Sequence, residues 1–404
     1  MIKNDSTSRL EILFWLLPCF LIILSCPTVS AQQTSRTLIK AQTIYTVDGT
    51  ILSPGQVLIQ DGRIAFVGSS IELSLPAEEV EVDTLIPGIV NAFSHAGLTG
   101  VGAEISREVT PEFDTASTID WQSRDFLEYL DQGVTTIQVL PETENVFAGF
   151  ACILKSAGDI DQRLVNPQQG VVLSVSSDPT SRNRSRSRPD SIYVRQPTNR
   201  MGVVWIIRNT IHQTRLNLGN TDLSPQALAV LNGIVDGSRP VISVSRADFD
   251  IRSALELGET NGFLPTIYGG DEVYRMIDEF KNSKARLVYT ALTTNSAGRS
   301  LRGPEGTELR WNVPGKLHTA EIQFCLAGEN LLDQAQFAVR FGLPKDVALE
   351  AITLSPATIL NIDKQLGSIT AGKEADLVAL SGDPLQPTSR VLWTMIGGKI
   401  YDTP

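Results

Sequence analysis

Acidic side chains follow several apolar segments of this 404-residue chain and are its best candidates for catalysis. Glu329 follows one segment, and Asp271 and Glu272 follow another. A close pair of carboxyl groups can separate its two pKa values and act as acid and base, and converging carboxylates can bind Mg²⁺ or Ca²⁺. We name Glu329, Asp271 and Glu272 as candidate catalytic residues. The alternative is that they are solvated loop acids, or that Glu272 begins a helix, whose dipole favours an acid there.

His95 is the candidate metal ligand. An imidazole can bind a metal or transfer protons near neutral pH. A catalytic zinc site needs about three protein ligands, so one histidine does not complete it, and His95 could instead only form hydrogen bonds within the fold. The chain has two other histidines, His212 and His318, in helix-like stretches, where we expect them to be structural or exposed.

A second set of polar residues could bind a substrate. It comprises Glu142, Asp178, Arg184, Thr294 and Asn295. Arg184 belongs to the segment 180–200, whose six arginines lie in an otherwise acidic protein. Guanidinium groups bind carboxylates and phosphates through two parallel hydrogen bonds. The same loop could be solvated or face a partner, and turn chemistry also explains Thr294 and Asn295.

The middle of the chain alternates apolar strands with helical patterns, which predicts βα units. The seven expected strands are Ile89–Ser94, Thr135–Leu140, Val171–Val175, Val241–Val244, Leu264–Tyr268, Leu287–Ala291 and Ile322–Leu326. A closed barrel needs an eighth strand, for which the candidates are Ala151–Lys155 and Val203–Ile207. The sequence leaves that choice open.

Both ends of the chain have short strands separated by turns. Asp61-Gly62 and Gly397-Gly398 supply the residues that tolerate positive φ in tight hairpins. These patterns predict a small β-domain built from both termini.

The first residues predict export. Positive side chains precede the apolar run Ile12–Leu24, and Val29-Ser30-Ala31 provides a cleavage site. We expect a signal peptide over 1–31 and a periplasmic or extracellular protein. A lipobox-like motif ending at Cys26 leaves lipid attachment open. Cleavage after Ala31 would leave Cys152 and Cys325, which we expect to be separate buried thiols.

Composition narrows the class of protein. The hydrophobic fraction of 42% is ordinary for a globular chain, and the net charge of −11 argues against nucleic-acid binding. We expect a small-molecule ligand and no membrane span; assembly into a homo-oligomer stays open.

Three stretches carry a resemblance to a known family. They are QDGRIAFVG (60–68), LIPGIVNAFSHAGL (85–98) and ALEAITLSPATILNIDKQLGSITAGKEADLVALSGDPL (348–385). The chain resembles the amidohydrolase superfamily, in particular its imidazolonepropionase-like branch. The resemblance implies an α/β fold: a (β/α)₈ barrel over 87–361, with a β-sandwich formed by 32–86 and 362–404. It also implies a site at the carboxy-terminal mouth of the barrel.

The family's metal ligands are mostly missing from this sequence. Members hold one or two divalent metals, such as zinc, through histidines after several strands and an aspartate after the last. Here Phe93 takes the first histidine position, His95 the second, and Val244 stands where another is expected, while Asn91 replaces the usual aspartate. The resemblance therefore leaves two alternatives for the cofactor. The chain either binds a divalent metal such as zinc, or it has lost the metal site together with these ligands and binds no cofactor.

Two functions follow from this reading. The inherited chemistry is hydrolysis of carbon–nitrogen bonds in amides or cyclic amides, which would need a site rebuilt around His95 and Glu329. The alternative is a metal-free pseudoenzyme that binds a small ligand. Catalysis predicts that His95 and at least two carboxylates converge, whereas a binding pocket predicts that Phe93 and Val244 pack inward.

Overall fold

The computed structural model describes residues 36–100, 102–104, 107–183, 196–216, 223–290, 292 and 311–402. The predicted signal peptide, Cys26 and the candidate site residues Arg184, Thr294 and Asn295 lie outside these ranges. Within them, no helix is both long and apolar enough to cross a membrane.

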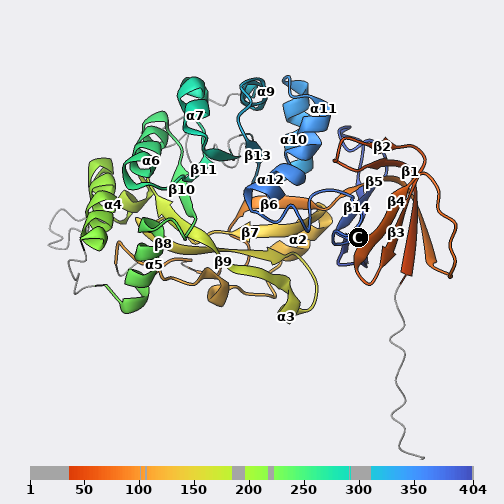
Figure 1. Ribbon diagram of the computed structural model, residues 1–404, viewed down its shortest axis with the longest axis horizontal. Coiled ribbons are helices and arrows are strands. Elements are labelled where there is room, and N and C mark those ends of the chain that lie inside the picture. Colours follow the sequence, from red (N-terminus) through yellow and green to blue (C-terminus); the bar gives the residue numbers. More distant parts are fainter. Residues whose placement is uncertain are drawn as a thin grey trace, which may run out of the picture. The chain divides into compact units, whose positions relative to one another are not determined.

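Eight strands form the barrel sheet, in the same order in space as in the chain (Figure 1). They are β6 (Ile89–Ser94), β7 (Val134–Val139), β8 (Phe147–Lys155), β9 (Leu164–Ser174), β10 (Val241–Ser245), β11 (Thr266–Gly269), β12 (Arg286–Tyr289) and β13 (Phe324–Leu326). Neighbouring strands are parallel except that β8 is antiparallel to both β7 and β9. The segment Ala151–Lys155 is therefore the eighth strand. The other candidate, Val203–Ile207, is wrong because it lies in the helix α4 (Arg200–Arg215).

The barrel is nearly closed between β13 and β6 by a segment that is not a strand. The backbone N–H of Leu326 donates to the Ala351 carbonyl at 2.9 Å, and that of Val90 donates to the Ile352 carbonyl at 3.0 Å. The buried Asn91 side chain adds two bonds, because its Nδ2 donates to the Gly328 carbonyl and its Oδ1 accepts from the Gly328 N–H. The Asn91 side chain thus replaces some of the backbone hydrogen bonds that would join β13 to β6 in a fully closed barrel.

Helices surround the strands, and the last of them contributes Ala357 and Ile359 to the apolar core inside the barrel. They are α2 (Asp125–Asp131), α3 (Ile160–Arg163), α4, α5 (Pro225–Val235), α6 (Asp248–Asn261), α7 (Ile277–Ser283), α9 (Val313–Thr319), α10 (Leu331–Arg340), α11 (Lys345–Glu350) and α12 (Leu354–Ile359). In Figure 1, α6, α7, α9, α10 and α11 stand in a row beside β10 to β13. One apolar core lies between strands and helices, and a second fills the barrel interior. The interior is therefore a packed core.

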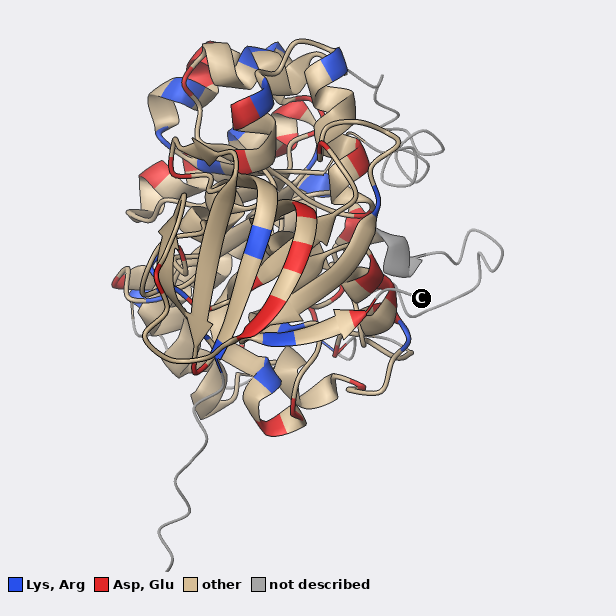
Figure 2. Ribbon diagram, turned by 90° about the vertical axis from the view of Figure 1, so that its right-hand side faces the viewer, with Lys and Arg blue, Asp and Glu red and all other residues tan. Residues whose placement is uncertain are grey.

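The two ends of the chain form one further sheet of eight strands. They are β1 (Arg36–Tyr45), β2 (Ile51–Leu52), β3 (Gly55–Gln60), β4 (Arg63–Gly68), β5 (Glu78–Pro87), β14 (Leu377–Leu380), β15 (Val391–Ile396) and β16 (Lys399–Asp402). The hairpins at Asp61-Gly62 and Gly397-Gly398 are confirmed, and all four residues have positive φ. β5 pairs with β1 on one side and β14 on the other, which joins the two ends. The red bands along one strand in Figure 2 mark acidic residues; in β5, Glu79, Glu81 and Asp83 are exposed while Val82 is buried, as expected for a strand with one solvated face.

Both cysteines of the described chain are free and buried, which confirms the expected separate thiols. Burial raises the pKa of the Cys152 thiol to about 12. A thiol in that state is poorly nucleophilic, so Cys152 serves packing within β8.

Candidate functional site

The positions that the resemblance assigns to metal-binding histidines are part of the barrel core. Val244 is buried among the interior residues, and Phe93 packs against the same core. The Phe93 ring lies with its centroid 6.5 Å from that of Tyr268 and 5.2 Å from that of His95, edge to face. Both residues therefore pack inward.

His95 is half-buried at the end of β6. Its Nδ1 lies 3.0 Å from the Leu140 carbonyl oxygen, which follows β7. Because that carbonyl can only accept, Nδ1 carries the proton in this contact. His95 is thus bound to the neighbouring strand through one ring nitrogen and packs against the Phe93 ring.

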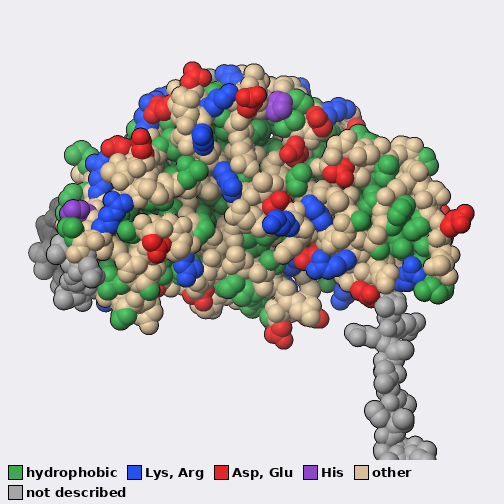
Figure 3. Space-filling view, in the orientation of Figure 1, with side chains coloured by type: hydrophobic (Ala, Val, Ile, Leu, Met, Phe, Trp, Pro, Cys, Tyr) green, Lys and Arg blue, Asp and Glu red, His purple; other side chains and the backbone are tan. Residues whose placement is uncertain are grey.

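The described donors do not fit the family's metal. No group of three or more histidine, cysteine, aspartate or glutamate side chains that could hold an ion occurs among the described residues. The other two histidines, His212 and His318, are exposed on α4 and α9, and histidine side chains lie at the surface in Figure 3.

A different polar cluster lies at the carboxy-terminal ends of three consecutive strands. Asp178 follows β9, Arg246 follows β10 and Asp271 follows β11. Nη1 and Nη2 of Arg246 donate to the two carboxylate oxygens of Asp178 at 3.2 and 2.9 Å. The hydroxyl of Thr143, after β7, donates to Asp178 at 2.6 Å. This fork-to-fork ion pair is a geometrically specific one.

Asp271 is the titratable centre of this cluster. It is 5% exposed, and burial raises the pKa of its carboxyl to about 6, against the opposing effect of Arg246 and with smaller contributions from Glu272 and Asp178. A carboxyl with this pKa exchanges its proton near neutrality, as a general acid or base must. Of the candidate catalytic residues, Asp271 has the environment closest to that role.

Glu272 lies beside Asp271, but its oxygens are engaged by the fold. One accepts from the Asp248 backbone N–H at 3.2 Å, at the start of α6, and the other lies 3.3 Å from Nη2 of Arg275. The acid therefore supports a helix N-terminus, as in the alternative drawn from sequence, although the helix is α6 rather than the one that follows Glu272.

The other two acidic candidates, Glu329 and Glu142, lie apart from Asp271 and Glu272. Glu329 follows β13 and is exposed, and its charge contributes to raising the pKa of Tyr129, behind the larger effect of burial. Glu142 is half-buried after β7, next to Thr143, and its backbone N–H donates to the Gly102 carbonyl. The structure thus brings together Asp178, Asp271 and Glu272, and leaves Glu329 at the solvent.

Sequence reasoning missed Arg246 and Thr143. Arg246 comes two residues after Val244, at the mouth end of its strand. The available signal was a charged residue directly after a buried strand. Thr143 had no signal beyond its neighbour Glu142.

Comparisons with known proteins agree with this architecture. Residues 309–401 match the model of the amidohydrolase family. The chain is 26% identical over 389 residues to the amidohydrolase tasK of Hapsidospora irregularis, covering 82% of this chain and 38% of that protein. It therefore spans about two fifths of the curated relative's length.

Solved structures share the fold. An amidohydrolase from Thermotoga maritima superposes with a TM-score of 0.80 at 24% identity, over 90% of this chain and 99% of that one. The ochratoxinase of A. niger superposes with a TM-score of 0.55 at 19% identity, over 92% and 97% of the two chains. At these identities the likeness shows the fold.

Proposed function

We propose that this chain, whose residues 309–401 match the amidohydrolase family model and which shares the fold of a solved amidohydrolase, hydrolyses carbon–nitrogen bonds in amides or cyclic amides and that Asp271 transfers the proton. The observation that carries this proposal is the buried Asp271 carboxyl, with its pKa of about 6, at the barrel mouth. Family members place their chemistry at this end of the barrel.

The proposed reaction uses the Asp271 carboxylate as a general base. It accepts a proton from a water molecule while the water oxygen attacks the amide carbonyl carbon. The protonated Asp271 then donates that proton to the leaving nitrogen as the carbon–nitrogen bond breaks, giving a carboxylic acid and an amine. Arg246 acts on Asp271 electrostatically and stabilises its ionised form.

The test is turnover by the purified chain of a panel of simple amides, lactams and N-acyl amino acids. We expect Asp271→Asn to lower kcat/KM by about 10²–10⁴-fold, the range for loss of a general base. We also expect the wild-type rate to rise with pH through about 6 as Asp271 ionises. Asp278→Asn, an exposed acid on α7, is the matched control. Turnover that is equal in wild type and Asp271→Asn would contradict the proposal.

The second candidate function is binding of a small molecule without catalysis. It is favoured by Phe93 and Val244, which pack into the barrel core where the family holds its metal. If no member of the panel is turned over, while amides bind and protect the folded chain against heat, this second function takes precedence.

A further inference from the structure

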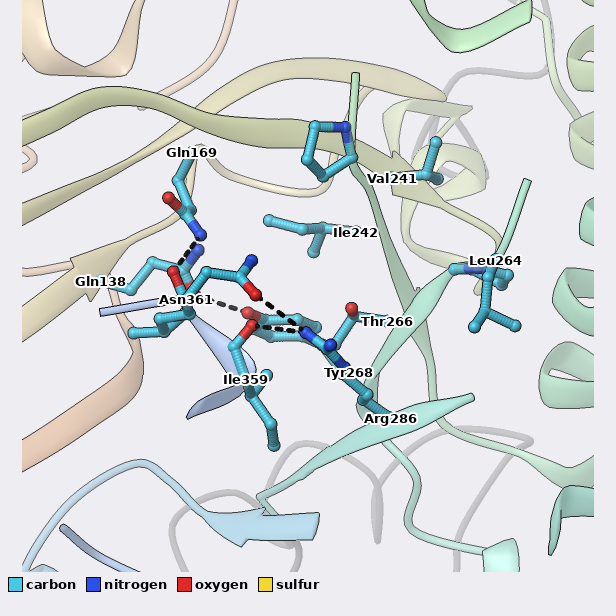
Figure 4. Close-up of a pocket in the computed structure, with 13 residues that line it drawn as sticks. Gln138, Gln169, Val241, Ile242, Leu264, Thr266, Tyr268, Arg286, Ile359 and Asn361 are labelled. Carbon is cyan, nitrogen blue, oxygen red and sulfur yellow. Dashed lines mark hydrogen bonds between the residues drawn. The ribbon is translucent and has the colours of Figure 1, made fainter. Parts of the chain in front are cut away.

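A cavity of about 220 Å³ lies at the end of the barrel opposite the mouth. It is lined by the first residues of three strands: Val241 of β10, Thr266 of β11 and Arg286 of β12. The segment Ile359–Asn361, at the end of α12, covers another side. Figure 4 shows the side chains of Gln138, Tyr268 and Arg286 reaching this space from three different strands.

Gln138 forms the inner end of the cavity. Its side chain is fully buried, and its Oε1 accepts a hydrogen bond of 2.5 Å from the Tyr268 hydroxyl. The amide Nε2 of Gln138 has no hydrogen-bond partner among the described atoms. A buried donor left in this state costs free energy. The free Nε2 therefore points to an acceptor inside the cavity.

Arg286 supplies positive charge to the same space. It is the one charged residue among the described residues that line the cavity. Its Nη1 donates to the Ile359 carbonyl and to Oδ1 of Asn361, both at the long distance of 3.3 Å. Both acceptors are uncharged, so the guanidinium can take up an anion without breaking an ion pair to them.

We propose that this cavity binds a small organic carboxylate, whose oxygens pair with Arg286 and accept from Nε2 of Gln138. The remaining lining includes the apolar side chains of Ile242, Leu264 and Leu360, which suit a short aliphatic or aromatic tail. The volume is below the roughly 300–1,000 Å³ usual for drug-sized ligands, so the ligand has few non-hydrogen atoms.

Charge selects the carboxylate over phosphate. A phosphate ester carries about −1.5 to −2 charges at neutral pH, whereas Arg286 provides a single positive charge. The planar guanidinium matches one carboxylate through two parallel hydrogen bonds.

The site also contacts the interior of the barrel. Tyr268, which lines the cavity and binds Gln138, lies beside Phe93, and Phe93 lies beside His95 at the mouth. One continuous row of packed rings thus runs from the cavity to the other end of the barrel.

Isothermal titration calorimetry on the full chain tests the site. Acetate, butyrate, hexanoate, benzoate and inorganic phosphate are titrated at matched ionic strength. We expect one carboxylate per chain with Kd of about 1 mM or tighter, and weaker binding of phosphate. Arg286→Gln and Gln138→Glu, which replaces the free donor by an acceptor, should each weaken carboxylate binding about tenfold or more.

Two control variants separate this site from other surfaces. Arg252→Gln removes an exposed arginine of α6, and Asp278→Asn removes an exposed acid of α7; both should bind the carboxylates like wild type. If Gln138→Glu does not fold, Gln138→Leu takes its place. No carboxylate binding at about 10 mM, binding unaffected by both site variants, or preference for phosphate would each overturn the proposal.

Discussion

At the barrel mouth, burial has a larger effect on the Asp271 carboxyl than any neighbouring charge. Removal from water raises its pKa from the ordinary 3.8 to about 6, although Arg246 acts in the opposite direction. A raised pKa means that the folded state binds the proton more tightly than the unfolded state does. The same property that suits Asp271 to proton transfer therefore costs stability at neutral pH.

This cost can be measured with Asp271→Asn. The stability contributed by protonated Asp271 is fully present below about pH 4, its unfolded pKa, and is lost as pH rises through about 6. Between about pH 4 and pH 7, wild type should lose about 2 kcal/mol of unfolding free energy relative to Asp271→Asn. Urea unfolding of both chains at the two pH values measures the difference. If the unfolding free energies of the two proteins changed with pH in parallel, the pKa of Asp271 would be the same in the folded and unfolded states.

The sequence shows that Phe93 cannot bind a metal, but it does not show where the Phe93 side chain lies in the fold. Its inability to bind a metal follows from the side chain itself. Its inward packing against the barrel core, next to Tyr268, follows only from the fold.

At the scale of elements, the Asn91 side chain helps to close the barrel at its seam, the junction between β6 and β13. Asn91 forms two hydrogen bonds with the backbone of Gly328 where β6 and β13 do not pair directly. Replacing it with alanine leaves a backbone donor and acceptor without partners at a largely buried position.

We expect Asn91→Ala to lower the free energy of unfolding by about 2 to 3 kcal/mol. Asn232→Ala, on the exposed face of α5, is the control and should change it by less than about 0.5 kcal/mol. Urea denaturation followed by circular dichroism gives both values. Equal stability of the two variants would mean that Ala351-Ile352 closes the seam without help from Asn91.

The strand β8 explains why the count of strands was ambiguous. Every residue of Phe147–Lys155 is buried, so the segment has no alternating pattern of exposure. In sequence, a short apolar run of this kind resembles a helix segment such as Val203–Ile207 as much as a strand. Pairing with β7 and β9 resolves the choice.

At the scale of the molecule, one buried ion cluster ties the barrel to the sheet formed by the termini. Nζ of Lys155 in β8 lies 2.8 Å from Asp376 and 2.9 Å from Glu374, just before β14. Burial lowers the pKa of Lys155, but the two carboxylates outweigh it and raise the pKa above its ordinary value. The ammonium group therefore stays charged inside the protein.

Lys155→Met should lower the free energy of unfolding by about 3 to 5 kcal/mol, because Asp376 is left buried without its cation. Lys40→Met removes a partly exposed lysine that pairs with the exposed Glu79 and should cost at most about 1 kcal/mol. Thermal and urea unfolding of the two variants provide the comparison. If the two variants lost similar amounts of unfolding free energy, the ion pairs of Lys155 would stabilise the protein no more than the surface pair of Lys40 and Glu79 does.

The sequence by itself determined seven of the eight barrel strands, the two tight hairpins, the joint sheet of the termini and the shortage of histidines, because these depend on local patterns and on composition. It also marked Asp178, Asp271 and Glu272 as acids after strands. Only the tertiary structure decided that Arg246 pairs with Asp178 and acts electrostatically on Asp271, that Glu329 stays at the solvent, and that Gln138 and Arg286 share a cavity. Those residues come from different strands, and their proximity is set by the order and curvature of the sheet, which no local pattern contains.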